Sequence, residues 1–170
     1  MRSLLLFRHA KSAWQRPGMR DTDRPLNERG HRDAVRMGRW MKAQGIEPRH
    51  VACSTARRAR QTLDDLNEAL ALPADAIEFS DHLYLAGLDS LLAHLAKVPV
   101  VDGPVMLIGH NPGLEDLLVH LCGPRLPYTD KGKLLTTANL AELALADDWR
   151  ELPPHHGRLR RLVRPREIAG

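Results

Sequence analysis

Histidine or arginine side chains follow three short apolar runs of the sequence: Arg8 and His9 after residues 4–7, Arg58 after 51–53, and His110 after 105–108. Arginine guanidinium groups bind phosphoryl oxygens in bidentate fashion, and a neutral imidazole can attack phosphorus. Taken alone, Arg8 and His9 could simply mark where a strand enters solvent. If the four residues share one cleft, the set suits chemistry on a phosphoryl group.

The three apolar runs have the length and composition of buried parallel strands. Between them, apolar residues recur at helical spacing in residues 34–41, 59–70, 88–95 and 114–121. This alternation predicts an α/β three-layer sandwich with a mainly parallel central sheet and helices on both faces. Ligands bind at the carboxyl ends of parallel strands, so neighbouring strands would bring the three polar turns to one edge.

Several residues mark the expected ends of these elements. Asn27 is a good N-cap, Gly45 a plausible C′ residue, Ser54-Thr55 a cap for the second helix, and Asn111-Pro112 a strong helix start. Residues 76–79 predict another strand. Residues 134–145 and 159–163 fit strands around a turn, although 138–146 can also be interpreted as helix.

The composition is typical of a globular protein, with 43% hydrophobic and 27% charged residues among 170. We expect a single domain over residues 1–170, no membrane span and a cytoplasmic location. The net charge of +4 suggests affinity for anions, and basic residues gather at 57–60 and 158–166. No aromatic stacking platform accompanies them, so nucleic acid stays a minor alternative. His155-His156 lacks further ligands, and we expect no metal.

Four segments resemble the histidine phosphatase superfamily, which includes phosphoglycerate mutases. Residues 6–14 are similar to its Arg-His-Gly opening, 23–30 to its D-x-P-L-x-x-x-G segment, 54–62 to its S-x-x-x-R-A-x-Q-T helix start, and 109–112 to its second-histidine turn. The resemblance extends from residue 4 to about 122. Ala10, the compact size and the segment 164–166 look most like the SixA-type phosphohistidine phosphatases.

The resemblance implies a role for each residue. His9 would be the nucleophile that forms a phosphohistidine intermediate, Arg8 and Arg58 would hold the phosphoryl oxygens, and His110 would hydrogen-bond the same oxygens. Gln15 falls where relatives often place an amide that contacts phosphate, and it fits an exposed loop equally well. No cofactor is implied.

One departure from the family bears on the substrate. Many relatives place a catalytic glutamate after the third strand, but residues 80–87 contain none, and Asp81 and His82 are only weak substitutes. This argues against a sugar-phosphate mutase. We therefore expect a phosphohistidine phosphatase acting on a protein such as a phosphotransfer domain. The alternatives are a phosphatase of small phosphorylated metabolites, or a non-catalytic binder of phosphoprotein or nucleic acid.

Overall fold

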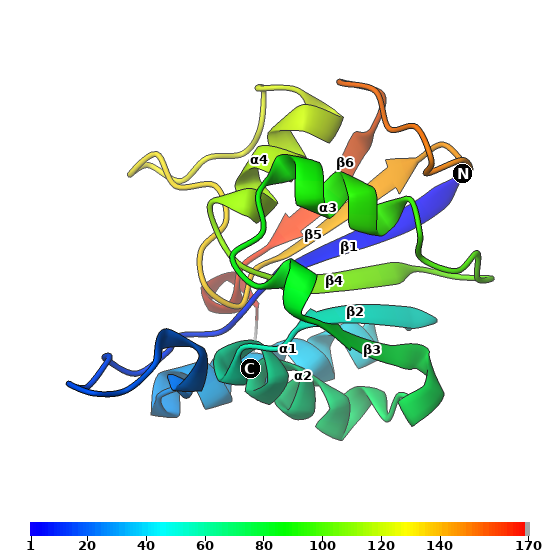
Figure 1. Ribbon diagram of the computed structural model, residues 1–170. Coiled ribbons are helices and arrows are strands. Elements are labelled where there is room, and N and C mark those ends of the chain that lie inside the picture. Colours follow the sequence, from blue (N-terminus) through cyan, green and yellow to red (C-terminus); the bar gives the residue numbers. More distant parts are fainter. Residues whose placement is uncertain (169–170) are drawn as a thin grey trace.

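Six strands form one sheet at the centre of the computed structural model, which describes residues 1–168 (Figure 1). Their order across the sheet is β3-β2-β4-β1-β5-β6. The bounds are Arg2–Arg8 for β1, His50–Ser54 for β2, Ile77–Ser80 for β3, Val105–Gly109 for β4, Leu140–Leu145 for β5 and Arg158–Val163 for β6. Strands β3, β2, β4 and β1 run parallel, and β5 is antiparallel to both of its neighbours. The prediction of a mainly parallel sheet is confirmed.

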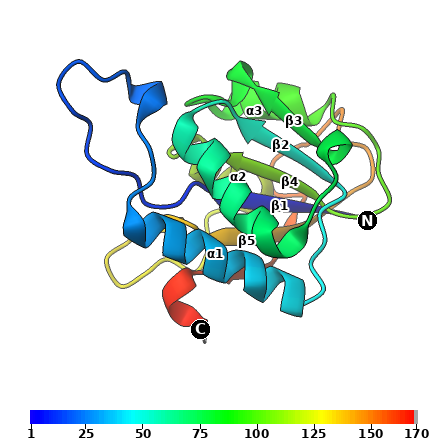
Figure 2. The ribbon, with the colours of Figure 1, turned by 90° about the horizontal axis from the view of Figure 1, so that it is seen from below.

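Helices cover both faces of this sheet, which confirms the three-layer sandwich (Figures 1 and 2). Helices α1 (Glu28–Ala43) and α2 (Arg57–Leu70) pack on one face, and α3 (Leu88–Leu95) and α4 (Gly113–Cys122) on the other. Side chains of a strand alternate between faces, so Leu4 and Leu6 join the core under α3 and α4, while Leu5 and Phe7 join the core under α1 and α2. Within residues 1–168, no helix is long and apolar enough to cross a membrane.

The predicted ends of α1 are confirmed. The side chain of Asn27 accepts a hydrogen bond from the Gly30 N–H at 2.8 Å, as an N-cap should. Gly45 follows the helix with φ of +71°, and the next N–H, that of Ile46, donates to the Met41 carbonyl at 2.9 Å. This left-handed C′ position favours glycine because it has no Cβ.

The predicted caps of α2 and α4 are wrong. Helix α2 begins after Ala56 and α4 after Pro112, both without a side-chain cap. The Ser54 hydroxyl bonds to His110 and to the Ala56 N–H, whereas Asn111 donates through Nδ2 to the Leu135 carbonyl at 2.9 Å. The Asn111 Oδ1, which would accept in a cap, has no partner within residues 1–168.

The C-terminal third differs from the expectation in length. Only residues 140–145 of the predicted strand 134–145 are extended in the sheet, because Ala138 has a positive φ of 58° and the chain turns there. The helical alternative for 138–146 is wrong. Strand β6 forms an edge of the sheet, with Arg158 and Arg160 exposed and Arg161 paired with Glu142 at 2.6 Å.

Candidate active site

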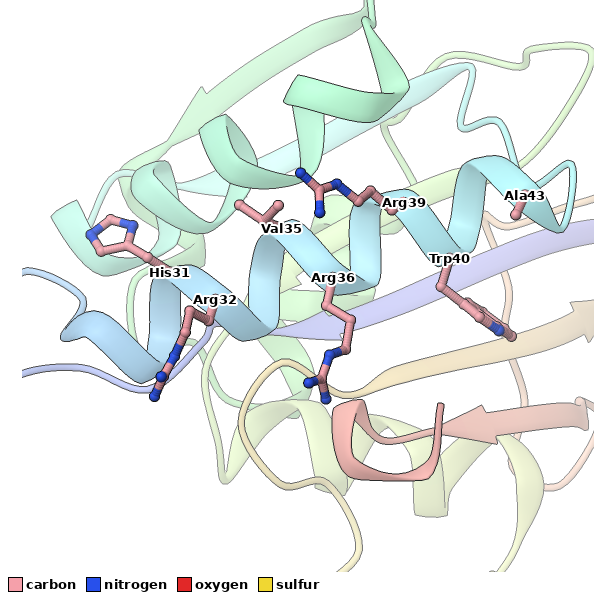
Figure 3. A pocket seen from close by; sticks show the side chains of 7 residues that line it. All are labelled: His31, Arg32, Val35, Arg36, Arg39, Trp40 and Ala43. Atoms are coloured by element: carbon pink, nitrogen blue, oxygen red, sulfur yellow. The ribbon is translucent and has the colours of Figure 1, made fainter. Parts of the chain in front are cut away.

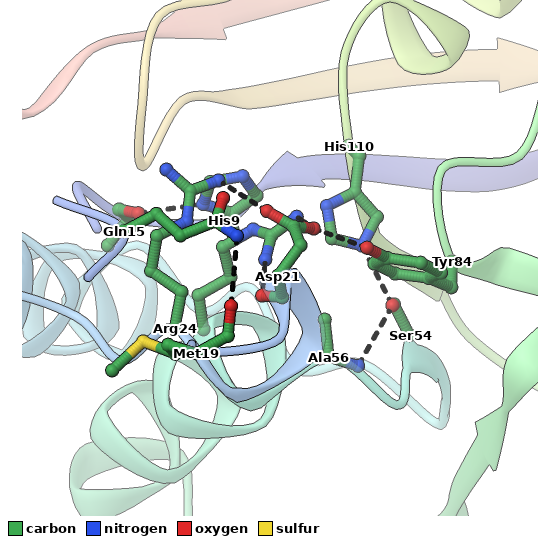
Figure 4. A network of polar contacts seen from close by, with 11 residues as sticks. His9, Gln15, Met19, Asp21, Arg24, Ser54, Ala56, Tyr84 and His110 are labelled. Atoms are coloured by element: carbon green, nitrogen blue, oxygen red, sulfur yellow. Dashed lines mark hydrogen bonds and ion pairs between the residues drawn. The ribbon is translucent and has the colours of Figure 1, made fainter. Parts of the chain in front are cut away.

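The ends of three parallel strands meet at one edge of the sheet, as predicted. The register places Arg8 opposite Gly109 and Cys53 opposite Ile108, and the His9 N–H donates to the Gly109 carbonyl at 3.1 Å. The His9 and His110 rings consequently lie 5.2 Å apart, centroid to centroid (Figure 4). The turns after β1, β2 and β4 therefore converge.

His9 has the protonation state that a nucleophile requires. The residue is only 8% exposed, and its Nδ1 lies 2.8 Å from the Ala10 carbonyl oxygen. A carbonyl can only accept, so Nδ1 carries the proton and Nε2 keeps its lone pair. Burial first, and then the charge interactions with His110, Arg58 and Arg8, lower the pKa of His9 to about 3 against the opposing effect of the Ala10 carbonyl.

His110 presents a buried donor beside His9. Its Nε2 lies 2.8 Å from the Ser54 hydroxyl, which also accepts the Ala56 N–H at 3.2 Å. Because the Ala56 amide can only donate, the Ser54 hydroxyl can give its proton to Nε2, which leaves the ring proton on Nδ1. That Nδ1 is buried and has no partner among residues 1–168. Burial, followed by the charge of Arg58, lowers the pKa of His110 to about 4.

Arg58 is a buried cation held by a carboxylate that the sequence did not single out. The residue is 2% exposed, and its guanidinium donates to the Asp21 carbonyl at 2.8 Å and to the Asp21 carboxylate at 2.9 Å. The same carboxylate accepts from the Tyr84 hydroxyl and from Arg24 (Figure 4). These bonds, first that of Tyr84 and then that of Arg58, lower the pKa of Asp21 against the effect of its burial.

Sequence reasoning took residues 16–25 only as a polar loop and missed both Asp21 and Tyr84. An arginine on the buried face of α2 calls for an acceptor, but the local pattern does not say which residue supplies it, so Asp21 could not be singled out. Tyr84 had no such signal, since its hydroxyl reaches Asp21 only through the tertiary fold.

Arg8, the last residue of β1, is the fourth of the predicted site residues. It is half-buried, and it donates to the Leu135 carbonyl at 2.9 Å. Within residues 1–168, Nε of Arg8, Nε of Arg58 and Nδ1 of His110 are buried donors without an acceptor. A buried donor without a partner costs about 1–3 kcal/mol. The site therefore has unused donors suited to an oxyanion with several acceptor oxygens.

The position of His9 is fixed by residues of α2 and α1. The Thr62 hydroxyl accepts the Ala10 N–H at 3.0 Å and donates to the Arg58 carbonyl at 2.7 Å. One side chain thus ties the turn after His9 to the helix that carries Arg58. Gly30 lets α1 approach the same turn, because a Cβ there would lie 2.1 Å from the Lys11 carbonyl oxygen.

Other predicted residues lie away from these contacts. Gln15 is exposed and donates to the Met19 carbonyl at 3.0 Å, a bond internal to its own loop (Figure 4). Asp81 accepts the Thr55 hydroxyl at 2.6 Å, and His82 is exposed. No group of histidine, cysteine or acidic side chains suited to a metal was found in residues 1–168.

A surface hollow lies along the outer face of α1, away from the converging turns after β1, β2 and β4. It measures about 660 Å³, and its lining residues, which include Val35, Trp40 and Arg39, all belong to this helix (Figure 3). None of Arg8, His9, Arg58 and His110 lines it.

Comparisons with known proteins agree with this geometry. The model of the histidine phosphatase superfamily (branch 1) matches residues 4–79. An uncharacterised protein of Mycobacterium tuberculosis is 32% identical over 87% of this chain and 92% of its own length. The phosphohistidine phosphatase SixA of Escherichia coli is 28% identical over 84% of each chain. A solved structure from Agrobacterium tumefaciens, assigned as the phosphohistidine phosphatase SixA, matches with a TM-score of 0.82 and 31% identity over 95% of this chain and 97% of its own. This chain belongs to the histidine phosphatase superfamily and is similar to its SixA-type members.

Proposed function

We propose that the protein is a phosphatase that removes phosphoryl groups from histidine side chains of proteins through a covalent intermediate on His9. The observation that carries the proposal is the neutral Nε2 of His9 among donors that lack acceptors, namely Arg8, Arg58 and His110. Similarity to SixA-type members supports the same activity.

In the first step, the Nε2 lone pair of His9 attacks phosphorus and the nitrogen–phosphorus bond of the substrate breaks. The departing imidazole of the substrate keeps the bonding electron pair and takes a proton from solvent. Arg8, Arg58 and His110 donate to the phosphoryl oxygens as their charge redistributes. In the second step, water attacks phosphorus and the bond to His9 breaks, which returns the electron pair to Nε2. The attacking water loses a proton to solvent, and inorganic phosphate leaves.

Because Asp21 is ionised, it cannot act as a general acid, and this favours phosphohistidine over alkyl phosphate esters as the substrate. Asp21 is the carboxylate in contact with Arg58, and its lowered pKa keeps it ionised near neutral pH. An ionised carboxylate cannot protonate an alkoxide leaving group, whereas imidazole takes a proton readily near pH 7. A phosphatase of small metabolites, which would release alcohols, therefore has less support in this site.

Chemical trapping tests the covalent step. The enzyme is exposed briefly to labelled phosphoramidate and then denatured in alkali. We expect acid-labile, alkali-stable label on the peptide that carries His9, and none in a His9→Ala variant that folds normally. Label on another residue, or substantial turnover by His9→Ala, would contradict the assignment.

A comparison of leaving groups tests the substrate class. Values of kcat/KM are measured for a phosphohistidine protein, phosphoramidate, p-nitrophenyl phosphate and a sugar phosphate in one buffer. General acid catalysis is worth about 10²–10⁴-fold, so the sugar phosphate should be slower by a factor of that order. An equal kcat/KM for the sugar phosphate would support the metabolite phosphatase instead. It would also mean that some residue of the site acts as a general acid.

A further inference from the structure

A strongly basic cleft of about 640 Å³ adjoins the candidate active site, and Arg8 lines it. Its walls come from the turn after β1, from α1, from residues 129–137 and from the turn at Pro165–Glu167. The cationic residues that line it are Arg8, Lys11, Arg29, Arg36, Lys131, Lys133 and Arg166, and the acidic ones are Asp33 and Asp130. Seven cationic and two acidic residues give the lining a net charge of +5, while the whole chain has +4. The other residues of the chain therefore carry no net positive charge.

Much of this charge is not neutralised by the protein itself. Arg29 lies 3.6 Å from Asp33, and Arg36 donates to the Pro165 carbonyl at 3.1 Å. The remaining cations outside the active site are exposed and form no ion pair within residues 1–168: Lys11, Lys131, Lys133 and Arg166.

The backbone that carries two of these lysines is held in place. The Thr129 N–H donates to the Lys133 carbonyl at 2.7 Å, and the Lys133 N–H donates to the Thr129 hydroxyl at 3.0 Å, which closes a tight turn around Lys131. Buried Arg164 donates to the Pro127 and Leu134 carbonyls, both at 2.9 Å, and anchors both sides of the turn.

The same loop is joined to the active site. The carbonyl of Leu135, two residues beyond Lys133, accepts the hydrogen bond from Arg8. Glu115 of α4 accepts the Leu135 N–H at 2.8 Å. These two bonds fix the position of the loop that carries Lys131 and Lys133 relative to Arg8, which would bind the transferred phosphoryl group.

We propose that this cleft binds carboxylate side chains that flank the phosphohistidine of a protein substrate. This proposal rests on the proposed function. It specifies in addition that the protein substrate is acidic around its phosphohistidine. Exposed lysines act as separate point charges that suit several mobile carboxylates, whereas the buried guanidinium groups beside His9 suit one phosphoryl group. No aromatic side chain lines the cleft within the described residues, so stacking of nucleic-acid bases has no platform there.

Paired peptides test the proposal. Two phosphohistidine peptides of equal length carry either glutamates or glutamines at the positions that flank the phosphohistidine. The proteins are the wild type and the triple variant Lys131→Glu, Lys133→Glu, Arg166→Glu. The control variant is Arg39→Glu, Lys97→Glu, Arg158→Glu, which makes the same change in net charge at exposed residues outside the cleft.

We expect wild type and control to prefer the acidic peptide about tenfold or more in kcat/KM at low ionic strength, through the charge complementarity that guides association. The cleft variant should lose this preference and keep its activity on p-nitrophenyl phosphate, which has no flanking carboxylate. High salt should reduce the preference of wild type, because the Debye length falls to about 3 Å at 1 M.

The contrary results separate this proposal from the proposed function. Equal kcat/KM for the two peptides, or an equal loss in the control variant, would overturn the carboxylate cleft alone. Inhibition of wild type by a single-stranded oligonucleotide but not by a polyglutamate peptide would also overturn it, in favour of nucleic acid. Hydrolysis of p-nitrophenyl phosphate with neither phosphohistidine peptide cleaved would overturn the proposed function, and the cleft proposal with it.

Discussion

Acidification from pH 7 to pH 5 should destabilise this protein through its two buried site histidines. An ordinary histidine has a pKa of about 6.5, while burial lowers the pKa of His9 to about 3 and that of His110 to about 4. Below pH 6.5 the unfolded chain binds a proton at each site that the folded chain does not bind. Stability is therefore greatest above pH 6.5 and is lost as the pH falls towards the folded pKa values.

The magnitude follows from this difference in bound protons. Each histidine contributes a slope of about 1.4 kcal/mol per pH unit within the window, or about 2 kcal/mol between pH 7 and pH 5. The two together should lower the free energy of unfolding by about 4 kcal/mol, a large part of the 5–15 kcal/mol typical of a folded domain. Both side chains are more than nine-tenths buried, so solvent screening reduces this value little.

Urea denaturation at several pH values measures the effect. Wild type is compared with the double variant His9→Gln, His110→Gln, and the difference between the two curves cancels all other titrating groups. The buffers contain no phosphate, because an anion bound between the arginines would favour protonated histidine. Parallel curves for the two proteins between pH 7 and pH 5 would refute the argument that burial keeps these imidazoles neutral.

Four further outcomes are expected. Arg58→Lys should lower kcat on p-nitrophenyl phosphate by about a hundredfold or more, because an ammonium group cannot keep the forked contact with Asp21 and also offer the free Nε–H; near-normal kcat would remove Arg58 from the phosphoryl pocket. Gln15→Ala should leave kcat/KM nearly unchanged, since its amide bonds within its own loop, and a large loss would show a phosphate contact. Exhaustive chelation should leave activity intact, whereas loss restored by one added metal would reveal a site not identified here. Gly113→Ala should lower the urea midpoint by the equivalent of about 1–3 kcal/mol, because a Cβ there would lie 1.9 Å from the Ala86 carbonyl oxygen; an unchanged midpoint would mean that the backbone yields easily.

The sequence predicted best where the signal was local. The apolar runs of β1, β2 and β4 were recognised because these strands are buried on both faces, and their parallel order then placed His9, Arg58 and His110 at one edge. The N-cap of α1 was also predicted, because Asn27 bonds to a backbone group only three residues away.

The failures share one physical cause, which is competition from distant partners. Ser54 and Asn111 are good capping residues, but the Ser54 hydroxyl bonds to His110 and to the Ala56 N–H, and the bond from Asn111 Nδ2 to the Leu135 carbonyl orients that side chain away from the helix. The role of Asp21 likewise depends on a guanidinium 37 residues away in the chain. Local patterns carry no information about such partners, so the strands and helices were more predictable than the polar contacts around the site.

The position of strand β6 at the edge of the sheet bears on how the exposed arginines of the C-terminal segment affect aggregation. An edge strand exposes unpaired backbone groups to which a second copy of the chain could add, the usual first step of sheet-to-sheet aggregation. In β6, Arg158 and Arg160 are exposed, with Arg160 donating to the Ser3 hydroxyl at 3.3 Å, and a register shift at Glu142 and Leu143 disturbs the regular pairing with β5. Two copies approaching edge to edge would bring these like charges together. A variant with valine at both positions should therefore form intermolecular sheet more readily on concentration.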